Sequence, residues 1–583
     1  MFLRKAKNKK TGRTYLSIVE SYRVPGVKNS RSRTIESLGY LDELEKKYDD
    51  PIAFFEAEIA KREALEKEIA EQKGKAVITI NIDKKETMDV GTDNRKNFGY
   101  VALSHIYHEL EIDQFIRNRQ RHANHEYDAN AIMRMLVFSR LLDPGSKKRD
   151  WENREQFFET ANFSLDDVYA ALTFLEPRIK ELQLWLHKRV EKNYGRDTSQ
   201  VYYDVTNYYF EIDDQDELRR KGMSKEGRRS PIVQMGLLSD SNGLPIAYEL
   251  FPGNTSDKVT LRPIIGKTEP HYKLGRIVVV ADRGVITGDN IWQLLDHGNG
   301  YVFSMSIAGA GKKFQDWVLD QKGYTVTEMD DKVVAFQIKS RLEPREINVT
   351  DKQGKNVKKV AHEKQVVYYS KKYADRAKKE RELAIEKARG LVSNPGRYNK
   401  STSYGAAKYV KNLKFDKKTG EILEDAKEHL YLDEELIKEE AKLDGYYAIV
   451  TSEYRETDNR ILEIYRNLWQ IEESFKITKS DLKSRPVYLS REDRIKTHFM
   501  VCFLSLLIIR ILQHRLGRIY SSSAILKSLK DCTCCHTSQN VYVLQYYDEI
   551  LQAIGADLNI DFNYKYLTSK EIKTYIGAAK KGL

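Results

Sequence analysis

The sequence predicts an α/β protein whose central mixed sheet is interrupted by an inserted β-rich region and flanked by helical N-terminal and C-terminal regions. Two observations carry this prediction. Between residues 196 and 305, runs rich in β-branched and aromatic residues alternate with segments of helical periodicity. Between 306 and 445 lies a lysine-rich block with strands of its own, after which the core pattern resumes. At 583 residues the chain exceeds one ordinary core, so several domains are expected.

Composition narrows the class of protein. With 41% hydrophobic and 32% charged residues the chain reads as soluble and globular, and its net charge of +12 favours a polyanionic partner, nucleic acid first. Four cysteines exclude a disulfide scaffold and fit a reducing, cytoplasmic compartment. The longest apolar run, at 499–509, is shorter than a membrane span and is followed by Arg510, so it predicts a buried core helix and no membrane partner.

The N-terminal region is basic. FLRKAK, RTYLSIVESYRV and SRTIESLGY predict three strands rich in Lys and Arg. Such a sheet can lie on a phosphate backbone, or it can be a solvated edge hairpin. A highly charged helix follows from about residue 49, and then come helical segments such as DANAIMRMLVFSRLL and SLDDVYAALTFL, with Asp and Ser as N-caps.

The central region contains the element order of an RNase H-like sheet. VYYDVTNYYFEI predicts the first strand, PIVQMGLLSD and LPIAYELF a hairpin, TLRPIIGKT a helix, RIVVVAD a buried strand, TGDNIWQLLDHG a helix and YVFSMSI another strand. Asp204 lies within the first strand and Asp282 at the end of the fourth. These strands are neighbours in such a sheet, so the two carboxylates can converge on one metal cluster.

A third acid is expected on the helix that contains YRNLWQIEESFKITKS. Tyr465, Glu472 and Lys479 are seven residues apart, which on a regular helix drifts only about 20° per step, so they line one face. A carboxylate on this partly apolar stripe is explained by metal binding, whereas the alternative is a core helix with a snorkelling glutamate. Glu473 points about 100° further round, where it could pair with Lys476 or orient a metal ligand. Trp469 could stack on a base, although a position in the core is the usual one for tryptophan.

These blocks carry a family resemblance. YYDVTNYY, VVVADRG and YRNLWQIEESFKITKS resemble the three catalytic blocks of a DDE transposase from a bacterial insertion sequence. The last block is similar to the Tyr-Arg-Glu-Lys signature of the IS-four superfamily, with Leu468 at the arginine position. GMSKEGRRSPIVQMGLLSDSNGLPIAYELFPGNTSD resembles the IS-sixteen-thirty-four-like subgroup, and the resemblance covers most of residues 1–516.

The resemblance implies an activity. Asp204, Asp282 and Glu472 would hold two Mg²⁺ ions, with Mn²⁺ able to substitute, because these cations take carboxylate oxygens. The enzyme would cut the ends of its element and join them to new DNA by hydrolysis and transesterification. Its partners would be double-stranded DNA, as terminal inverted repeats and target, and a second copy in a homodimer. The expected location is the bacterial cytoplasm, at the nucleoid.

Further residues are candidates for DNA contacts. Tyr465 and Lys479 are expected at the DNA end. Lys225, Arg228 and Arg229 could hold DNA at the entry to the hairpin or belong to a solvated loop, and Arg283 could touch phosphate or pair with an acid. The cluster at Cys532–His536 matches no strong zinc spacing.

Two other functions stay open, a metal-dependent nuclease without strand transfer and a domesticated DNA-binding protein. The expected regions are a basic DNA-binding region with a charged helix (1–75), a helical DNA-binding or linker region (76–195), the first core part (196–305), the insertion (306–445), the second core part with the Glu472 helix (446–516) and a helical C-terminal region (517–583).

Overall fold

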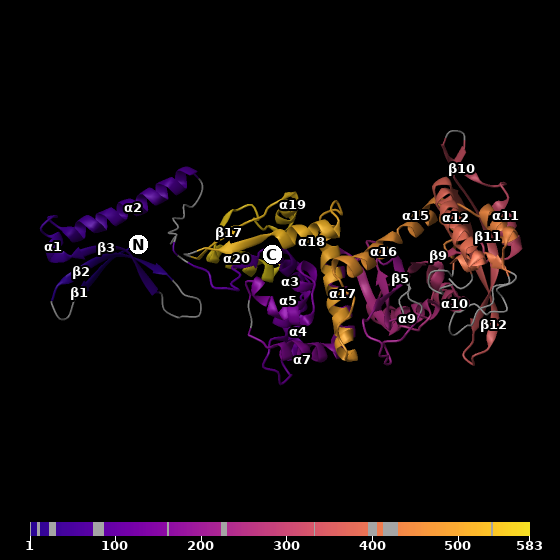
Figure 1. Ribbon diagram of the computed structural model, residues 1–583, viewed down its shortest axis with the longest axis horizontal. Coiled ribbons are helices and arrows are strands. Elements are labelled where there is room, and N and C mark those ends of the chain that lie inside the picture. The colour runs from indigo at the N-terminus through magenta and orange to yellow at the C-terminus, as the bar shows by residue number, and fades with distance from the viewer. Residues whose placement is uncertain are drawn as a thin grey trace. The chain divides into compact units, whose positions relative to one another are not determined.

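The chain forms two compact units, Met1–Gly91 and Thr92–Leu583, whose elements are labelled in Figure 1. The structure is a computed structural model. It describes residues 2–7, 12–22, 31–73, 85, 87–159, 162–222, 230–330, 333–394, 405–411, 430–537 and 540–582.

The first unit is a three-stranded antiparallel sheet with a long helix, which confirms the three expected strands. Its elements are β1 (Phe2–Lys7), β2 (Thr14–Tyr22), β3 (Arg31–Tyr40), α1 (Leu41–Leu44) and α2 (Pro51–Lys73). Leu16, Ile18 and Val19 of the middle strand are fully buried. Ion pairs such as Lys5 to Glu56, at 3.0 Å, join α2 to the strands, so the apolar side of the sheet is covered.

The second unit begins with a helical region built around a long buried helix. The expected caps are present: the Asp128 side chain accepts from two backbone N–H groups at the start of α5, and Ser164 forms a capping box with Asp167 at the start of α7. The helices are α3 (Tyr100–Glu109), α4 (Ile112–Gln120), α5 (Ala129–Leu142), α6 (Lys147–Glu152), α7 (Leu165–Leu175), α8 (Ile179–Tyr194) and, much later in the chain, α17 (Glu492–Arg515).

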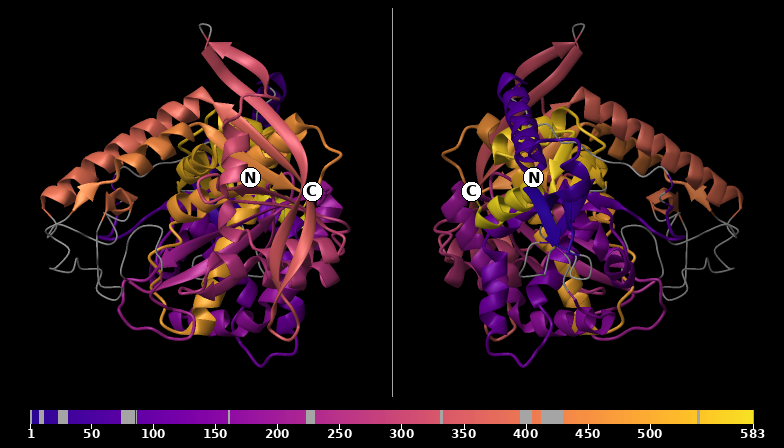
Figure 2. Two further views of the ribbon diagram at one scale, coloured as in Figure 1. Left: turned by 90° about the vertical axis from the view of Figure 1, so that its right-hand side faces the viewer. Right: turned by 90° about the vertical axis from the view of Figure 1, so that its left-hand side faces the viewer.

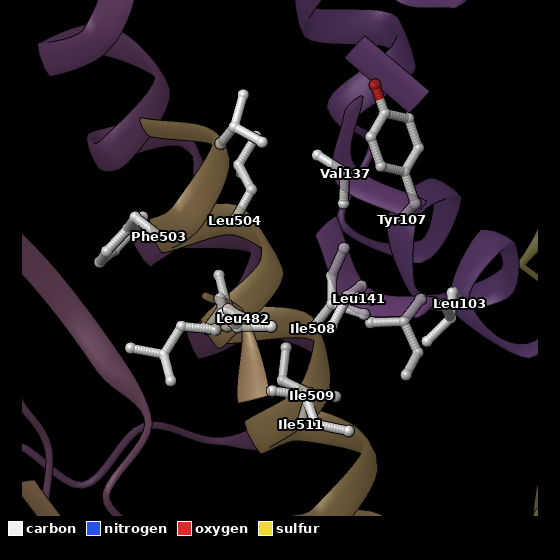
Figure 3. Packing of buried hydrophobic residues seen from close by; sticks show 14 of the residues in the cluster. Leu103, Tyr107, Val137, Leu141, Leu482, Phe503, Leu504, Ile508, Ile509 and Ile511 are labelled. Carbon is white, nitrogen blue, oxygen red and sulfur yellow. The ribbon is translucent and has the colours of Figure 1, made fainter. Parts of the chain in front are cut away.

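Helix α17 is the centre of the main hydrophobic core. It is long and apolar enough to span a membrane, but 94% of its most apolar window is buried inside the protein. Figure 3 shows Ile508 and Leu504 of α17 packed among Leu141 and Val137 of α5, with Leu482 on the same core. The expectation of a buried core helix is confirmed.

The second core forms around a mixed sheet. Along the chain, the first five strands of this sheet have the RNase H order. β5 (Gln200–Tyr209), β6 (Ile232–Ser239) and β7 (Pro245–Pro252) are antiparallel neighbours. β8 (Val278–Ala281) pairs in parallel with β5, and β9 (Gly300–Met305) in parallel with β8. Helices α9 (Leu261–Tyr272) and α10 (Gly288–Asp296) make the connections.

The insertion lengthens this sheet. The order across the sheet is β10-β11-β12-β15-β9-β8-β5-β6-β7, so β15, where the core resumes, pairs with β9, and the strands of the insertion continue the sheet beyond β15. Figure 2 shows the β10–β11 hairpin and α12 projecting in different directions. The insertion contains α11 (Lys312–Leu319), β10 (Thr325–Asp330), β11 (Val333–Thr350), β12 (Asn356–Ser370), α12 (Lys371–Ser393), β13 (Val410–Lys411), β14 (Tyr431–Leu432) and α14 (Glu434–Lys442). The core resumes with β15 (Tyr446–Thr451).

The C-terminal region adds strands as well as helices. β4 (Arg95–Asn97), from the start of the helical region, pairs with β16 (Thr533–His536). The sheet continues through β17 (Val541–Leu544) and β18 (Tyr566–Thr568). The helices are α18 (Ser522–Asp531), α19 (Glu549–Leu558) and α20 (Ser569–Lys581), and α20 packs on α3.

Candidate active site

Asp204 and Asp282 lie on neighbouring parallel strands. The register of β5 and β8 pairs Tyr203 with Ala281, and each acid follows its member of that pair directly. Neighbouring strands are about 4.8 Å apart, so the two carboxylates start from adjacent backbone positions. Asp204 is half-buried, whereas Asp282 is exposed just beyond the end of β8.

Both acids point to the same face of the sheet. Tyr203 and Ala281 belong to the core on one face, whereas Tyr202 and Val280 belong to the core on the other. Because side chains alternate along a strand, Asp204 and Asp282 share the face of Tyr202 and Val280.

Ser304, in the neighbouring strand β9, supports this placement of Asp282. Its hydroxyl donates a 2.6 Å hydrogen bond to Asp282 Oδ1, and the Arg283 backbone N–H donates to the same oxygen at 2.7 Å. A carboxylate held by two donors keeps one rotamer. Asp282 is therefore positioned before any ligand binds.

The segment with the third acid is anchored along β5. It consists of α15 (Asp458–Arg466), α16 (Trp469–Lys476) and a π-helical turn, η7 (Ile477–Asp481). The Tyr202 hydroxyl donates to the Ile464 carbonyl at 3.3 Å, and the Tyr208 hydroxyl lies 2.7 Å from Thr478 Oγ1.

The two anchors are separated by similar distances along β5 and along the helical segment. Six strand residues between Tyr202 and Tyr208 span about 20 Å, and fourteen helical residues between Ile464 and Thr478 span about 21 Å. The helical segment therefore runs along β5 on the face that carries Asp204, and Glu472 lies between the two anchors.

The charges of Glu472 and Asp282 both affect the hydroxyl of Tyr465. Burial raises the pKa of the Tyr465 hydroxyl to about 12; the Ser304 hydroxyl opposes this rise, and the negative charges of Asp282 and Glu472 add to it. Both charges therefore lie near enough to the Tyr465 hydroxyl to affect it. Tyr465 stays protonated at neutral pH and can donate a hydrogen bond there.

The expected single stripe of Tyr465, Glu472 and Lys479 is only partly present. The prediction assumed one regular helix, but the segment changes from α16 to the π turn at Ile477. A π turn holds more residues than an α turn, which rotates Lys479 away from the position that a seven-residue spacing gives. Glu472 itself is exposed, while Leu468 and Phe475 on either side are buried.

For Glu473 and for Trp469 the structure contradicts one of the two roles expected from the sequence. Glu473 pairs with Arg510 of α17, Nη1 to Oε2 at 2.5 Å, and not with Lys476. Arg510 is only 2% exposed and needs a carboxylate beside it. Trp469 is 50% exposed and not in the core, because Leu468 takes the buried position at the start of α16.

Of the other residues predicted to contact DNA, the structure describes only some. Arg283 is exposed directly beside Asp282. Arg466, which was not among the predicted contacts, stacks on Phe336 of β11, with Cζ 5.4 Å from the ring centre. Lys225, Arg228 and Arg229 lie outside the described residues.

Three residues near the site were missed by sequence reasoning. Ser304 and Arg510 carry no local signal, since each acts through a strand or helix far away in the chain. Asp257 ends the segment GNTSD, and its carboxylate lies 3.8 Å from the position that a Cβ on Gly284 would take, next to the loop of Asp282. Its position at the end of that short polar segment was the available signal.

The donor set suits a hard divalent cation. Asp204 and Asp282 offer carboxylate oxygens from adjacent strands, the ligands that Mg²⁺ takes. Within the described part of the chain, no three acidic, imidazole or thiol side chains are already close enough to share an ion. The Glu472 side chain must turn toward the aspartates to complete such a set, and its exposure on α16 leaves it room to do so.

Comparison with known proteins places this arrangement in a family. The family described as transposase DDE domain matches residues 210–508, and the IS1634 family transposase N-terminal domain matches residues 3–76. No curated protein sequence matches the chain. Among solved structures, the cryo-EM structure of the piggyBac transposase synaptic complex with hairpin DNA is similar at 8% identity over 83% of this chain and 84% of that chain, with a TM-score of 0.33.

The family assignment does not depend on that structure, because the DDE domain alone covers just over half of the 583 residues. The chain belongs to the IS1634 family of DDE transposases, enzymes that cleave DNA and carry out strand transfer.

Proposed function

We propose that Asp204, Asp282 and Glu472 are the three catalytic acids of this transposase. The observation that carries the proposal is their common face: two acids on adjacent strands, and the third on a helix anchored to one of those strands at both ends. We further propose that they hold two Mg²⁺ ions, which Mn²⁺ can replace, since the family uses divalent metal and the donors are carboxylates. When bound, such ions activate the attacking oxygen and stabilise the leaving one.

The neighbouring side chains have separate tasks. Ser304 and the Arg283 backbone hold the Asp282 carboxylate in place. The protonated Tyr465 hydroxyl donates to a phosphate oxygen of the DNA end, and Lys479 contributes a charge nearby. This assignment puts the chain in the Tyr-Arg-Glu-Lys branch of the IS-four superfamily, with the buried Leu468 replacing the arginine.

The reaction consists of two displacements at phosphorus. In the first, water attacks a phosphodiester at the element end, and the broken P–O bond leaves a 3′-hydroxyl. In the second, that hydroxyl attacks a target phosphodiester, forming one P–O bond and breaking another. One set of acids can serve both steps because only the nucleophile differs.

We also propose that the enzyme acts as a dimer on DNA in the bacterial cytoplasm, at the nucleoid. An element has two inverted terminal repeats, and both ends must be cut and joined to the same target. Two active sites related by a two-fold axis match two inverted ends. The substrates are then the terminal inverted repeats and the target duplex, and the enzyme is a homodimer on the DNA.

Alanine substitution of the acids tests the proposal. Asp204→Ala, Asp282→Ala and Glu472→Ala should each lose Mg²⁺-dependent cleavage, while binding to a terminal-repeat duplex stays within a few-fold, because phosphate contacts supply most of the affinity. Glu463→Ala is the matched control, since Glu463 is an exposed acid of α15 paired with Arg460.

Cleavage and joining should be measured on labelled element-end DNA. Near-normal cleavage by any one of the three variants would remove that residue from the catalytic set. Cleavage by the wild type without any joined product would instead favour a nuclease that does not transfer strands.

A further inference from the structure

A cavity of about 230 Å³ lies between the helical region and the loop that follows the π turn. Its walls come from the end of α5, the start of α6, the loop 483–489 and α17. The loop is fixed at both sides: the Val487 backbone N–H donates to the Tyr209 carbonyl of β5 at 3.4 Å, and the Leu482 side chain lies in the core beside α17 (Figure 3).

The walls of this cavity carry an excess of positive charge. Arg140, Lys147, Lys483 and Arg485 all line it. Arg140 is 3% exposed and Lys147 is 4% exposed, so two of these cations are buried. Buried charge is costly unless an opposite charge or strong acceptors compensate it.

The protein compensates this charge only in part. Arg140 donates to backbone carbonyls, those of Leu482 at 3.2 Å and Gly145 at 3.0 Å among them, which carry no full negative charge. The Lys147 ammonium makes no hydrogen bond, and its nearest carboxylate oxygen, on Asp150, is 3.7 Å away. Burial lowers the pKa of Lys147 to about 8, with the charge of Arg140 adding to the effect.

His498 completes the buried wall without adding charge. Burial lowers the pKa of its imidazole well below the usual value, and the charges of Lys147 and Arg140 act in the same direction. Its Nε2 lies 3.2 Å from the Ser484 carbonyl. The buried surroundings thus contain two cations and one acid, Asp150, whose carboxylate oxygens also lack hydrogen-bond partners. A ligand with a compact negative charge and several acceptor oxygens would accept from the donors of Arg140 and Lys147, and burial raises the pKa of the Asp150 carboxyl, which favours its uncharged form beside such a ligand.

We infer that this cavity is a phosphate-binding pocket and that its occupant is a backbone phosphate of the DNA strand held at the active site. The position supports DNA as the source of the phosphate. The loop that lines the cavity is tied to β5 by the bond from the Val487 N–H to the carbonyl of Tyr209, which is five residues beyond Asp204. Five strand residues span about 17 Å, the length of about five nucleotides along a duplex axis. The assignment rests on the proposed role of Asp204.

Inorganic phosphate is the first probe. Phosphate, compared with chloride at equal ionic strength, should raise the melting temperature of the full chain, because a ligand that binds only the folded state stabilises it. Lys147→Met should lose at least half of this shift. Lys148→Met is the matched control, since Lys148 is the next residue of α6 but is exposed and paired with Glu152. Lys483→Met, on the exposed rim, should also reduce the shift and serves if Lys147→Met fails to fold.

Element-end DNA is the second probe. Replacing single phosphates near the cleavage point by neutral methylphosphonates should weaken wild-type binding several-fold at one position, about five nucleotides away. Lys147→Met should bind that DNA no more weakly than unmodified DNA, and its salt slope should fall by about 1. The DNA assignment would be overturned if the wild type and Lys147→Met lost the same affinity at every modified position. The pocket itself would be overturned if phosphate shifted the melting temperature of Lys147→Met and of Lys483→Met as much as that of the wild type.

Both measurements are independent of catalysis. They can be repeated in the Asp204→Ala background, where the phosphate shift and the methylphosphonate pattern should persist. If the proposed acids are wrong, their alanine variants will retain cleavage. If the pocket is wrong, Lys147→Met will respond to phosphate and to the modified DNA as the wild type does.

Discussion

At the residue scale, Glu472 and Glu473 are adjacent acids with different surroundings. Glu472 is exposed on the face that carries Asp204, and Glu473 is bound to the buried Arg510. Activity and stability should therefore separate between the two positions.

Replacing each glutamate by glutamine tests this separation. Glu472→Gln should abolish metal-dependent cleavage and change the free energy of unfolding by no more than about 0.5 kcal/mol, because the side chain is exposed. Glu473→Gln should keep most of the cleavage but lower the free energy of unfolding by about 1–3 kcal/mol, because Arg510 loses its charged partner. Cleavage against Mn²⁺ concentration, together with urea denaturation, measures both. An inactive, stable Glu473→Gln beside an active Glu472→Gln would reverse the assignment.

At the element scale, one hydrogen bond joins β5 to the π turn. Thr478 Oγ1 donates to the Phe475 carbonyl at 2.9 Å, so its only proton is used, and the Tyr208 hydroxyl at 2.7 Å must be the donor to Thr478. This buried bond fixes the turn that carries Lys479.

Removal of either partner should loosen that turn. Tyr208→Phe and Thr478→Val should each lower the free energy of unfolding by about 1–2 kcal/mol, and the double variant should lose less than the sum, by about 1 kcal/mol. Cleavage should fall in each variant while binding to element-end DNA is largely kept. The check is a double-mutant cycle by denaturation; strictly additive losses would mean that the two groups do not interact.

Local patterns predicted the strands and the two aspartates because alternation, turns and buried runs are encoded within a few residues. VYYDVTNYYFEI and RIVVVAD show this for β5 and β8. The π turn escaped prediction because it has no local signature. The Glu473–Arg510 pair joins residues that are 37 positions apart in the chain. The hydrogen bond from Arg140 to the Leu482 carbonyl, beside the cavity, joins residues that are 342 positions apart. Such contacts are visible only in the packed structure.

At the scale of the whole molecule, Met1–Gly91 is a compact unit that matches the family's N-terminal domain. Its strands carry Arg4, Lys5, Lys7 and Arg33, which suits contact with phosphates. Deleting residues 1–91 should weaken binding to element ends and flatten its salt dependence, because fewer counterions are released. Affinity measured from about 50 to 200 mM salt is the test. An unchanged slope would exclude this unit from the DNA interface.

Acid sensitivity is a second property of the whole molecule. Burial lowers the pKa of His105, His108, His187 and His498. For His187 the folded value is about 4, so the unfolded chain takes up a proton first as pH falls below about 6.5. Stability is therefore full above that pH and is lost between about 6.5 and 4, by about 2 kcal/mol at pH 5 from His187 alone.

The measurement is urea denaturation at pH 7.5 and 5.0. His187→Gln should reduce the difference between the two pH values, because glutamine does not titrate in this range. A wild-type free energy of unfolding that did not change between these pH values would contradict the prediction.

The pairing of β15 with β9 has a consequence for the order of assembly during synthesis. β9 ends at Met305, but its neighbour in the sheet begins only at Tyr446, after the whole insertion has been made. Contacts between distant parts of a chain form slowly, and domains fold largely as the ribosome releases them. The N-terminal unit can fold early, whereas the helix with Glu472 cannot dock until late. A nascent chain therefore has a folded N-terminal unit before the strands and the helix of the candidate active site have come together.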